Sequence, residues 1–267
     1  MMNATFQSMR RWALTAAGVG LVSLGVVGCG SMPALDADAP APGLILGARS
    51  AGDSPFAADR AISADAIVAR YVRYTGGSAK PKPERSEMRV VPDEDGWSTE
   101  RWLLPRNPGG DATLERRIRL SRGGDGSILL HESSGGEEDF TTRFDPPVRL
   151  AAALMRPGNE VVSAFRVRVM DNDSGGDFRS GNGTARVTYA GRQRVETPMG
   201  VFDADLLMTE LSIESGIATI ERRQRQWIAT VRPGRSMIVA EAVHERVEVF
   251  GFDRERRMRM VIESIVR

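Results

Sequence analysis

Apolar and polar residues alternate along much of the chain. Phe165, Val167 and Val169 are apolar, whereas arginines occupy the positions between them. Because the side chains of a strand point alternately to its two faces, this period of two predicts strands with one buried face and one solvated face. Glu241 and Glu245 interrupt the apolar face of one such segment. The same alternation recurs over residues 114–120, 207–213, 239–249 and 258–262.

Turn-forming residues separate these segments. Short connections rich in glycine, aspartate and asparagine favour hairpins between neighbouring strands. The sequence therefore predicts a mainly β protein, in which an antiparallel meander forms a curved sheet or a barrel. The predicted turns are Gly123-Gly124-Asp125-Gly126, Gly135-Gly136, Gly175-Gly176, Asn182-Gly183 and Pro233-Gly234.

One or two short helices are expected beside the strands. Ile62, Ala66 and Ala69 recur at helical spacing before a glycine pair, which predicts a helix over residues 63–75. A second short helix is predicted over residues 148–155, after a pair of prolines.

The first 28 residues have the pattern of a secretory signal peptide. Arg10 and Arg11 supply positive charge, and residues 12–27 are uncharged and mostly apolar. The stretch ends in Val26-Val27-Gly28-Cys29, which resembles the lipobox of bacterial lipoproteins. The resemblance implies cleavage before Cys29, diacylglycerol on its sulfur and an acyl chain on the new amino terminus.

A lipid bilayer is thus the expected partner of Cys29, because two or three acyl chains suffice for stable anchoring. The cysteine is followed by Gly30 and Ser31 rather than by aspartate, which favours the outer membrane over the inner membrane. Residues 29–60, rich in Ala, Asp, Gly and Pro, are expected to form a flexible tether. Residues 61–267 are expected to form one β-rich domain in the periplasm.

The composition limits the chemistry of this domain. A net charge of +1 gives no broad basic field, so nucleic acid is not an expected partner. Cys29 is the one cysteine, so the chain forms no internal disulfide. His131 and His244 are the two histidines, and neither stands in a motif for a catalytic nucleophile. We therefore expect no cofactor and no catalytic site.

Three polar segments remain as weak candidates. Residues 171–177 place three aspartates around glycines, which suits either a calcium loop or a plain hairpin. Glu137-Glu138-Asp139 is typical of a solvated loop. Arg222-Arg223-Gln224-Arg225 indicates either a polar sheet face or a contact with lipid headgroups or an anionic glycan.

Large apolar side chains supply the main functional hypothesis. Trp97, Trp102 and Trp227, together with Met258 and Met260, either belong to the core or line a cavity. A curved sheet with an apolar concave face is a natural site for a lipid or another hydrophobic ligand.

The second half also resembles a group of bacterial periplasmic β-rich proteins of unknown function. The resemblance covers residues 140–250 and implies a curved antiparallel sheet or barrel, akin to the half-barrels of lipoprotein carriers. It implies no activity. The pieces that carry it are Phe144-Asp145-Pro146-Pro147 with Arg156-Pro157-Gly158, Thr197–Ala204, and Trp227 with Pro233-Gly234.

These patterns together predict a membrane-anchored, non-enzymatic lipoprotein. It would bind a hydrophobic or envelope ligand or serve a structural role. Two alternatives stay open: a hydrolase that acts on envelope material through carboxylates, and a subunit of an envelope complex.

Overall fold

The computed structural model describes residues 44–49, 54–61, 63–76, 83–107, 109–136, 140–216, 218–250 and 252–266. Most of these residues lie in strands, which confirms the mainly β prediction. The single helix of the described part is α2 (Ala58–Ala61), one turn long. The strands are β1 (Ile45–Arg49), β2 (Phe56–Ala57), β3 (Ile67–Thr75), β4 (Glu84–Asp93), β5 (Gly96–Leu103), β6 (Thr113–Arg122), β7 (Ile128–Gly135), β8 (Phe140–Ala151), β9 (Leu154–Met155), β10 (Glu160–Asp171), β11 (Asp177–Thr197), β12 (Gly200–Ser215), β13 (Ala218–Arg232), β14 (Arg235–Val249) and β15 (Phe252–Val266).

The strands close into an antiparallel barrel. Neighbours in sequence pair with one another from β3 to β8 and from β10 to β15, β8 pairs with β10, and β15 pairs with β3. Within the described residues, the ring thus holds the twelve strands β3–β8 and β10–β15. Closure pairs the edges that an open sheet would leave exposed. Two short pairings lie beside the ring, β1 with β11 and β2 with β9.

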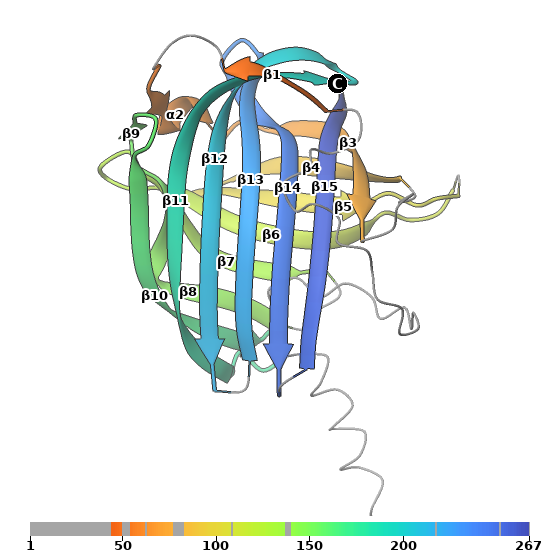
Figure 1. The fold of residues 1–267 in the computed structure, drawn as a ribbon. Coiled ribbons are helices and arrows are strands. Elements are labelled where there is room, and N and C mark those ends of the chain that lie inside the picture. Colours follow the sequence, from red (N-terminus) through yellow and green to blue (C-terminus); the bar gives the residue numbers. More distant parts are fainter. Residues whose placement is uncertain are drawn as a thin grey trace, which may run out of the picture.

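The barrel has two layers whose strands cross at a steep angle. Figure 1 shows β10–β15 running nearly vertically in front, whereas β4–β8 run closer to the horizontal behind them. The front strands are long, and β11 alone has 21 residues. Crossed layers of this kind bring the inward side chains of both halves against one another.

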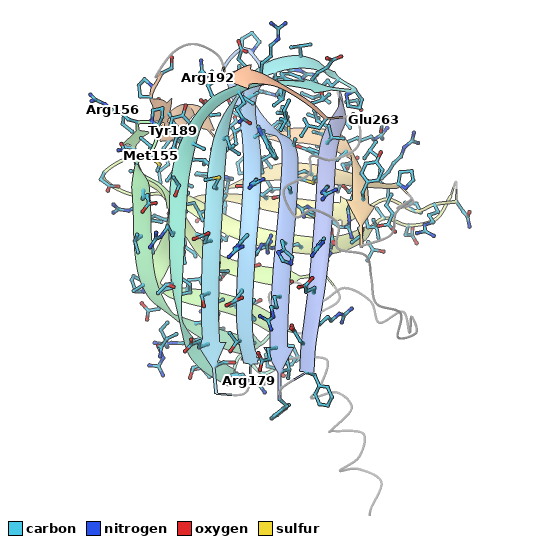
Figure 2. All side chains as sticks on the ribbon, in the orientation of Figure 1. Met155, Arg156, Arg179, Tyr189, Arg192 and Glu263 are labelled. Atoms are coloured by element: carbon cyan, nitrogen blue, oxygen red, sulfur yellow. The ribbon has the colours of Figure 1, made fainter. Side chains whose placement is uncertain are left out.

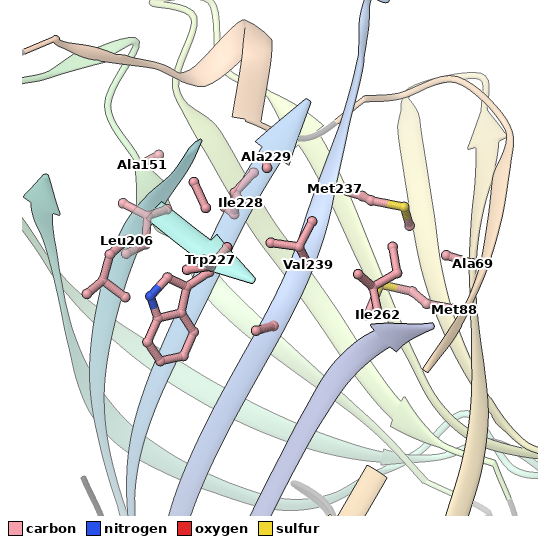
Figure 3. Packing of buried hydrophobic residues seen from close by; sticks show 14 of the residues in the cluster. Ala69, Met88, Ala151, Leu206, Trp227, Ile228, Ala229, Met237, Val239 and Ile262 are labelled. Atoms are coloured by element: carbon pink, nitrogen blue, oxygen red, sulfur yellow. The ribbon is translucent and has the colours of Figure 1, made fainter. Parts of the chain in front are cut away.

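The main apolar core lies toward the end of the barrel that β1 and α2 cover, which we call the capped end (Figure 1). Figure 3 shows Met88, Met237 and Ile262 side by side in this interior, with Trp227 nearer to Leu206. A smaller cluster of buried side chains belongs to the other part of the barrel. It consists of Phe144, Val148, Phe165, Val167, Ala185, Ile213 and Ile220.

The cap is built from residues that precede the barrel strands. Phe56 is only 1% exposed, and its ring centroid lies 5.5 Å from that of Tyr189. Tyr189 Oη lies 3.1 Å from the carbonyl oxygen of Ser54, at the upper end in Figure 2. Leu44 is buried as well. The described parts of the expected tether, residues 29–60, therefore pack on the barrel, because the few apolar side chains of this segment find a preformed surface.

The predicted helix over residues 63–75 is wrong, since β3 occupies most of this segment. Ile67, Ala69 and Tyr71 point inward with period two, and Arg73 continues the same face at 3% exposure. A buried arginine on the apolar face hid the alternation. β-branched and aromatic residues suit a strand here, and the pairing with β15 and β4 overrides the local helical spacing.

The second predicted helix, over residues 148–155, is also wrong. β8 runs through Val148 to Ala151, both buried, and pairs with β7. β9 then pairs with β2. The short apolar run has no period that distinguishes helix from strand, so the neighbouring strand decided its structure.

One predicted turn is a strand interior. Asn182 and Gly183 lie within β11, where Gly183 pairs with Phe165. A β carbon at Gly183 would lie 2.4 Å from the ring of Phe165, so glycine serves here for close packing. None of the helices in the described part is long and apolar enough to cross a membrane.

Candidate functional site

A set of charged side chains lies inside the barrel beside the apolar core. We call this set the interior charge layer. Its members occupy inward positions of β3, β5, β6, β13, β14 and β15, where the alternation would place apolar residues. They are Arg73, Arg101, Glu115, Arg116, Arg222, Glu241, Glu245 and Arg256.

Glu241 is the best-satisfied member of the layer. Its side chain is 1% exposed and lies 2.5 Å from Arg101 Nη2. Gln224 and Gln226 donate side-chain hydrogen bonds to the same carboxylate. Burial alone would raise the pKa of Glu241, but Arg101 and Arg222 together lower it below the ordinary value. The carboxylate is therefore held in its charged form.

Glu115 forms a second hub. A bulge in the pairing of β5 with β6 leaves Glu115 unpaired between Arg116 and Leu114. The carboxylate reaches Arg73 Nη1 at 2.5 Å and Arg256 Nη2 at 2.9 Å. Burial opposes its ionisation, yet the nearby guanidinium groups lower the pKa of Glu115. One carboxylate thus serves two arginines.

The remaining arginines are less well matched. Arg222 lies 3.6 Å from Glu245, with both side chains more than nine-tenths buried. The buried Nε atoms of Arg222 and Arg101 have no hydrogen-bond acceptor among the described residues. Buried donors without a partner are costly and uncommon in native proteins.

Arg116 has the weakest compensation of all. Its Nε donates to Ser133 Oγ at 3.2 Å, and it makes no ion pair with a described residue. Burial, followed by the neighbouring cations Arg222 and Arg101, lowers the pKa of Arg116 to about 9. The guanidinium therefore stays charged at neutral pH, although its surroundings disfavour the charge.

A cavity lies between this charge and the apolar core. Its empty space is about 710 Å³, partly open to solvent, and the centre of a water molecule can occupy about 80 Å³ of it. Its polar lining residues are Thr99, Arg101, Arg116, Gln224, Gln226, Ser236 and Glu241. Its apolar wall consists of Met88, Val90, Ile118, Leu120, Leu150, Met237 and Ile238. We call this space the interior cavity.

A smaller cavity shares two lining residues with the interior cavity. Arg101 and Arg116 line both spaces, and Arg222, Glu245 and Met258 join them in the smaller one. The unsatisfied arginines thus converge where the two spaces meet.

The three tryptophans, for which the sequence left core and cavity lining open, do not line this cavity. Trp97 is buried in the core at 1% exposure, and Trp227 donates through Nε1 to Gln193. Trp102 instead donates to Glu100 and lies under the guanidinium of Arg89. Of the two predicted methionines, Met258 lines the smaller cavity and Met260 is core. Met88 and Met237 take the predicted role in the interior cavity.

The two histidines lie on different strands. His131 Nε2 is 2.7 Å from Ser121 Oγ, and burial lowers its pKa. His244 Nε2 lies 3.6 Å from Glu255. The two histidines thus contact different partners, Ser121 and Glu255, and neither contact includes the other histidine.

The aspartate-rich segment forms the hairpin between β10 and β11. Asp171 Oδ1 accepts the backbone N–H groups of Asp173 and Ser174, which is an ordinary turn interaction. Among the described residues, no cluster of three histidine, cysteine or acidic side chains could hold a metal ion.

The arginine run divides between the two faces of β13. Arg222 and Gln224 face the interior, whereas Arg223 faces outward and lies 4.0 Å from Glu210. The sequence contained one signal of the interior charge layer: Glu241 and Glu245 interrupt an otherwise apolar face. Cys29 and Glu137-Glu138-Asp139 lie outside the described residues.

Comparison with known proteins adds little to this site. No protein-family model matches the chain, and no curated protein is significantly similar to it. One solved structure is similar, a candidate exported protein with a YmcC-like fold from Bacteroides fragilis. It is 16% identical, the match covers 75% of this chain and 95% of that chain, and the TM-score is 0.41.

Proposed function

We propose that this chain is an exported, lipid-anchored protein that binds a hydrophobic ligand inside its barrel without acting as an enzyme. The observation that carries the proposal is the interior cavity. Its apolar wall is made of aliphatic and methionine side chains from β4, β6, β8 and β14. Sites for small ligands typically combine such walls with a few polar groups, as this one does.

The buried carboxylates favour binding over a hydrolase that would work through them. A general acid needs a raised pKa so that it holds a proton at neutral pH. Arginines lower the pKa of both Glu115 and Glu241 instead. These two carboxylates therefore organise the interior rather than supply protons.

The anchor is proposed from the sequence Val26-Val27-Gly28-Cys29. Acylation of Cys29 would hold the barrel on the outer membrane, facing the periplasm. The test is labelling of the full chain and of its Cys29→Ala variant with radioactive palmitate. Label in the wild type alone is expected, and equal label in both forms would contradict the anchor.

Ligand binding is tested on residues 30–267, exported behind a cleavable signal that lacks the lipobox. This form keeps the whole described structure, which begins at Leu44. Native mass spectrometry of the purified protein should show an adduct of lipid mass, and solvent extraction should release it.

Two variants localise the adduct. Leu150→Trp places a large ring into the interior cavity, whereas Val162→Trp changes a side chain that is 65% exposed. We expect the adduct to disappear only in Leu150→Trp, with circular dichroism unchanged in both. A wild type without any adduct, or an adduct that survives Leu150→Trp, would contradict binding in this cavity.

A further inference from the structure

The interior charge layer contains more positive than negative groups. Glu115 is shared by Arg73 and Arg256, and Glu241 is engaged by Arg101. Glu245 lies beside Arg222, so three carboxylates serve four arginines, and Arg116 makes no ion pair of its own with a described residue. The excess cation is placed at the wall of the interior cavity.

The arginines without a full set of partners lie together at the two cavities. Arg116 lines both cavities, and the smaller one is also lined by Arg101 and Arg222. The buried Nε atoms of the latter two lack acceptors among the described residues. An uncompensated buried charge is expensive, and a site that keeps one is suited to a ligand that supplies the opposite charge.

We propose that the ligand is an amphipathic anion whose carboxylate or phosphate head pairs with Arg116, beside Arg101 and Arg222, while its hydrocarbon chain lies on the apolar wall. This inference rests on the proposed function, because it concerns the same cavity. An arginine fork binds the two oxygens of such a head in parallel.

The wall of the cavity agrees with this orientation. Ile118 and Leu120 follow Arg116 on the inward face of β6, so polarity falls steadily along one strand. Val90 on β4 extends the apolar surface within the same layer, and Met237 and Ile238 extend it from β14. A chain that starts at Arg116 would thus run along apolar side chains toward the capped end.

The test compares three probes on residues 30–267 by isothermal titration calorimetry at neutral pH. Decanoate has both the chain and the anionic head, decanol has only the chain, and inorganic phosphate has only an anion. We expect decanoate to bind about tenfold or more tightly than decanol, because a hydrogen bond to a charged group contributes about 1.5–3 kcal/mol. Phosphate alone should bind far more weakly than decanoate, because it lacks the chain.

The matched variants are Arg116→Gln and Arg119→Gln. Arg119 lies on the same strand but faces outward, in surface ion pairs of 3.7 Å and 3.6 Å with Asp93 and Asp95. We expect Arg116→Gln to weaken decanoate about tenfold or more and to leave decanol unchanged. Arg119→Gln should change neither the affinity for decanoate nor the affinity for decanol.

The outcomes separate the two proposals. Equal binding of decanoate and decanol, unaffected by Arg116→Gln, would overturn the anionic head and leave the hydrophobic site standing. Phosphate that binds as tightly as decanoate would also overturn the amphipathic ligand, since the chain would then contribute nothing. Failure of both decanoate and decanol to bind would overturn the proposed function itself.

Discussion

Two regions share the interior of this barrel and are stabilised in different ways. At the capped end, side chains such as Trp97, Tyr71 and Ile262 are almost completely buried among apolar neighbours. In the interior charge layer, equally inward positions hold arginines and glutamates such as Arg101 and Glu241. Apolar burial stabilises the first region roughly in proportion to area, whereas the second must offset desolvation of each charge with a partner.

The difference between the two regions indicates that a functional site is expected in the interior charge layer. Burial stabilises the apolar end, and the side chains of its cluster carry no charge that needs a partner. The charge layer has well-matched groups, such as Glu241, and a poorly matched one, Arg116. Arg116 destabilises the fold because no ion-pair partner compensates its charge. Such destabilisation is typical of binding sites.

The largest effect is expected from Glu241→Gln. This change removes the ion-pair partner of Arg101, and breaking a buried pair costs roughly 3–5 kcal/mol. Urea unfolding followed by circular dichroism measures the loss. Its control is Glu255→Gln, because Glu255 is half-exposed and its ion pairs lie on the surface.

A double variant sharpens this result. Arg101→Gln combined with Glu241→Gln removes both partners, so no unmatched charge remains at that position. It should regain at least half of the stability lost in Glu241→Gln. Additive losses in the double variant would mean that the two groups do not act as a pair.

Phe56→Ala tests the apolar end and should lose roughly 3–5 kcal/mol, as truncation of a buried phenylalanine usually does. The unfolding free energy in urea is again the measured quantity. Phe252→Ala is its control, since Phe252 is 80% exposed and should change little. A stable Phe56→Ala protein would indicate that residues before the ring contribute nothing to the fold.

Arg116→Gln should have the opposite sign and raise the stability of the ligand-free protein by about 1–2 kcal/mol. The change removes an uncompensated cation and loses only one hydrogen bond, to Ser133. Thermal unfolding of extracted, ligand-free protein measures it. A destabilised variant would show that Arg116 stabilises the fold, as the apolar side chains of the capped end do.

The smallest effect concerns acid. The pKa of Glu115 and that of Glu241 lie below their ordinary value of 4.5, so the folded protein holds fewer protons on them than the unfolded chain. Their contribution is complete above pH 4.5 and is lost as pH falls through the lowered pKa values, by at most about 1.4 kcal/mol per pH unit for each group. The urea concentration at the unfolding midpoint should decrease as the pH is lowered below 4.5. The decrease should be smaller in Glu241→Gln than in the wild type. An unchanged pH slope in that variant would contradict the ionic role of Glu241.

The sequence alone predicted the strands correctly where successive side chains face the core and the solvent in turn. Strands such as the one through Phe165 and Val167, and the final one through Met258 and Ile262, followed directly from period two. The same rule failed for β3, because Arg73 lies on the buried face and breaks the apolar alternation. The helical spacing of the neighbouring residues then predicted a helix. A rule that equates polar with exposed cannot detect a buried ion pair.

The chain by itself thus determined an antiparallel β protein with hairpin turns, because side-chain alternation is a local property of each strand. Only the tertiary structure decided that β3 meets β15 to close the ring, that residues 44–49 and 54–61 cap it, and that Arg116 lies near Arg222. Arg116 and Arg222 are far apart in sequence and meet through barrel closure. Charge matching across a closed interior depends on that closure, and no window of sequence contains it.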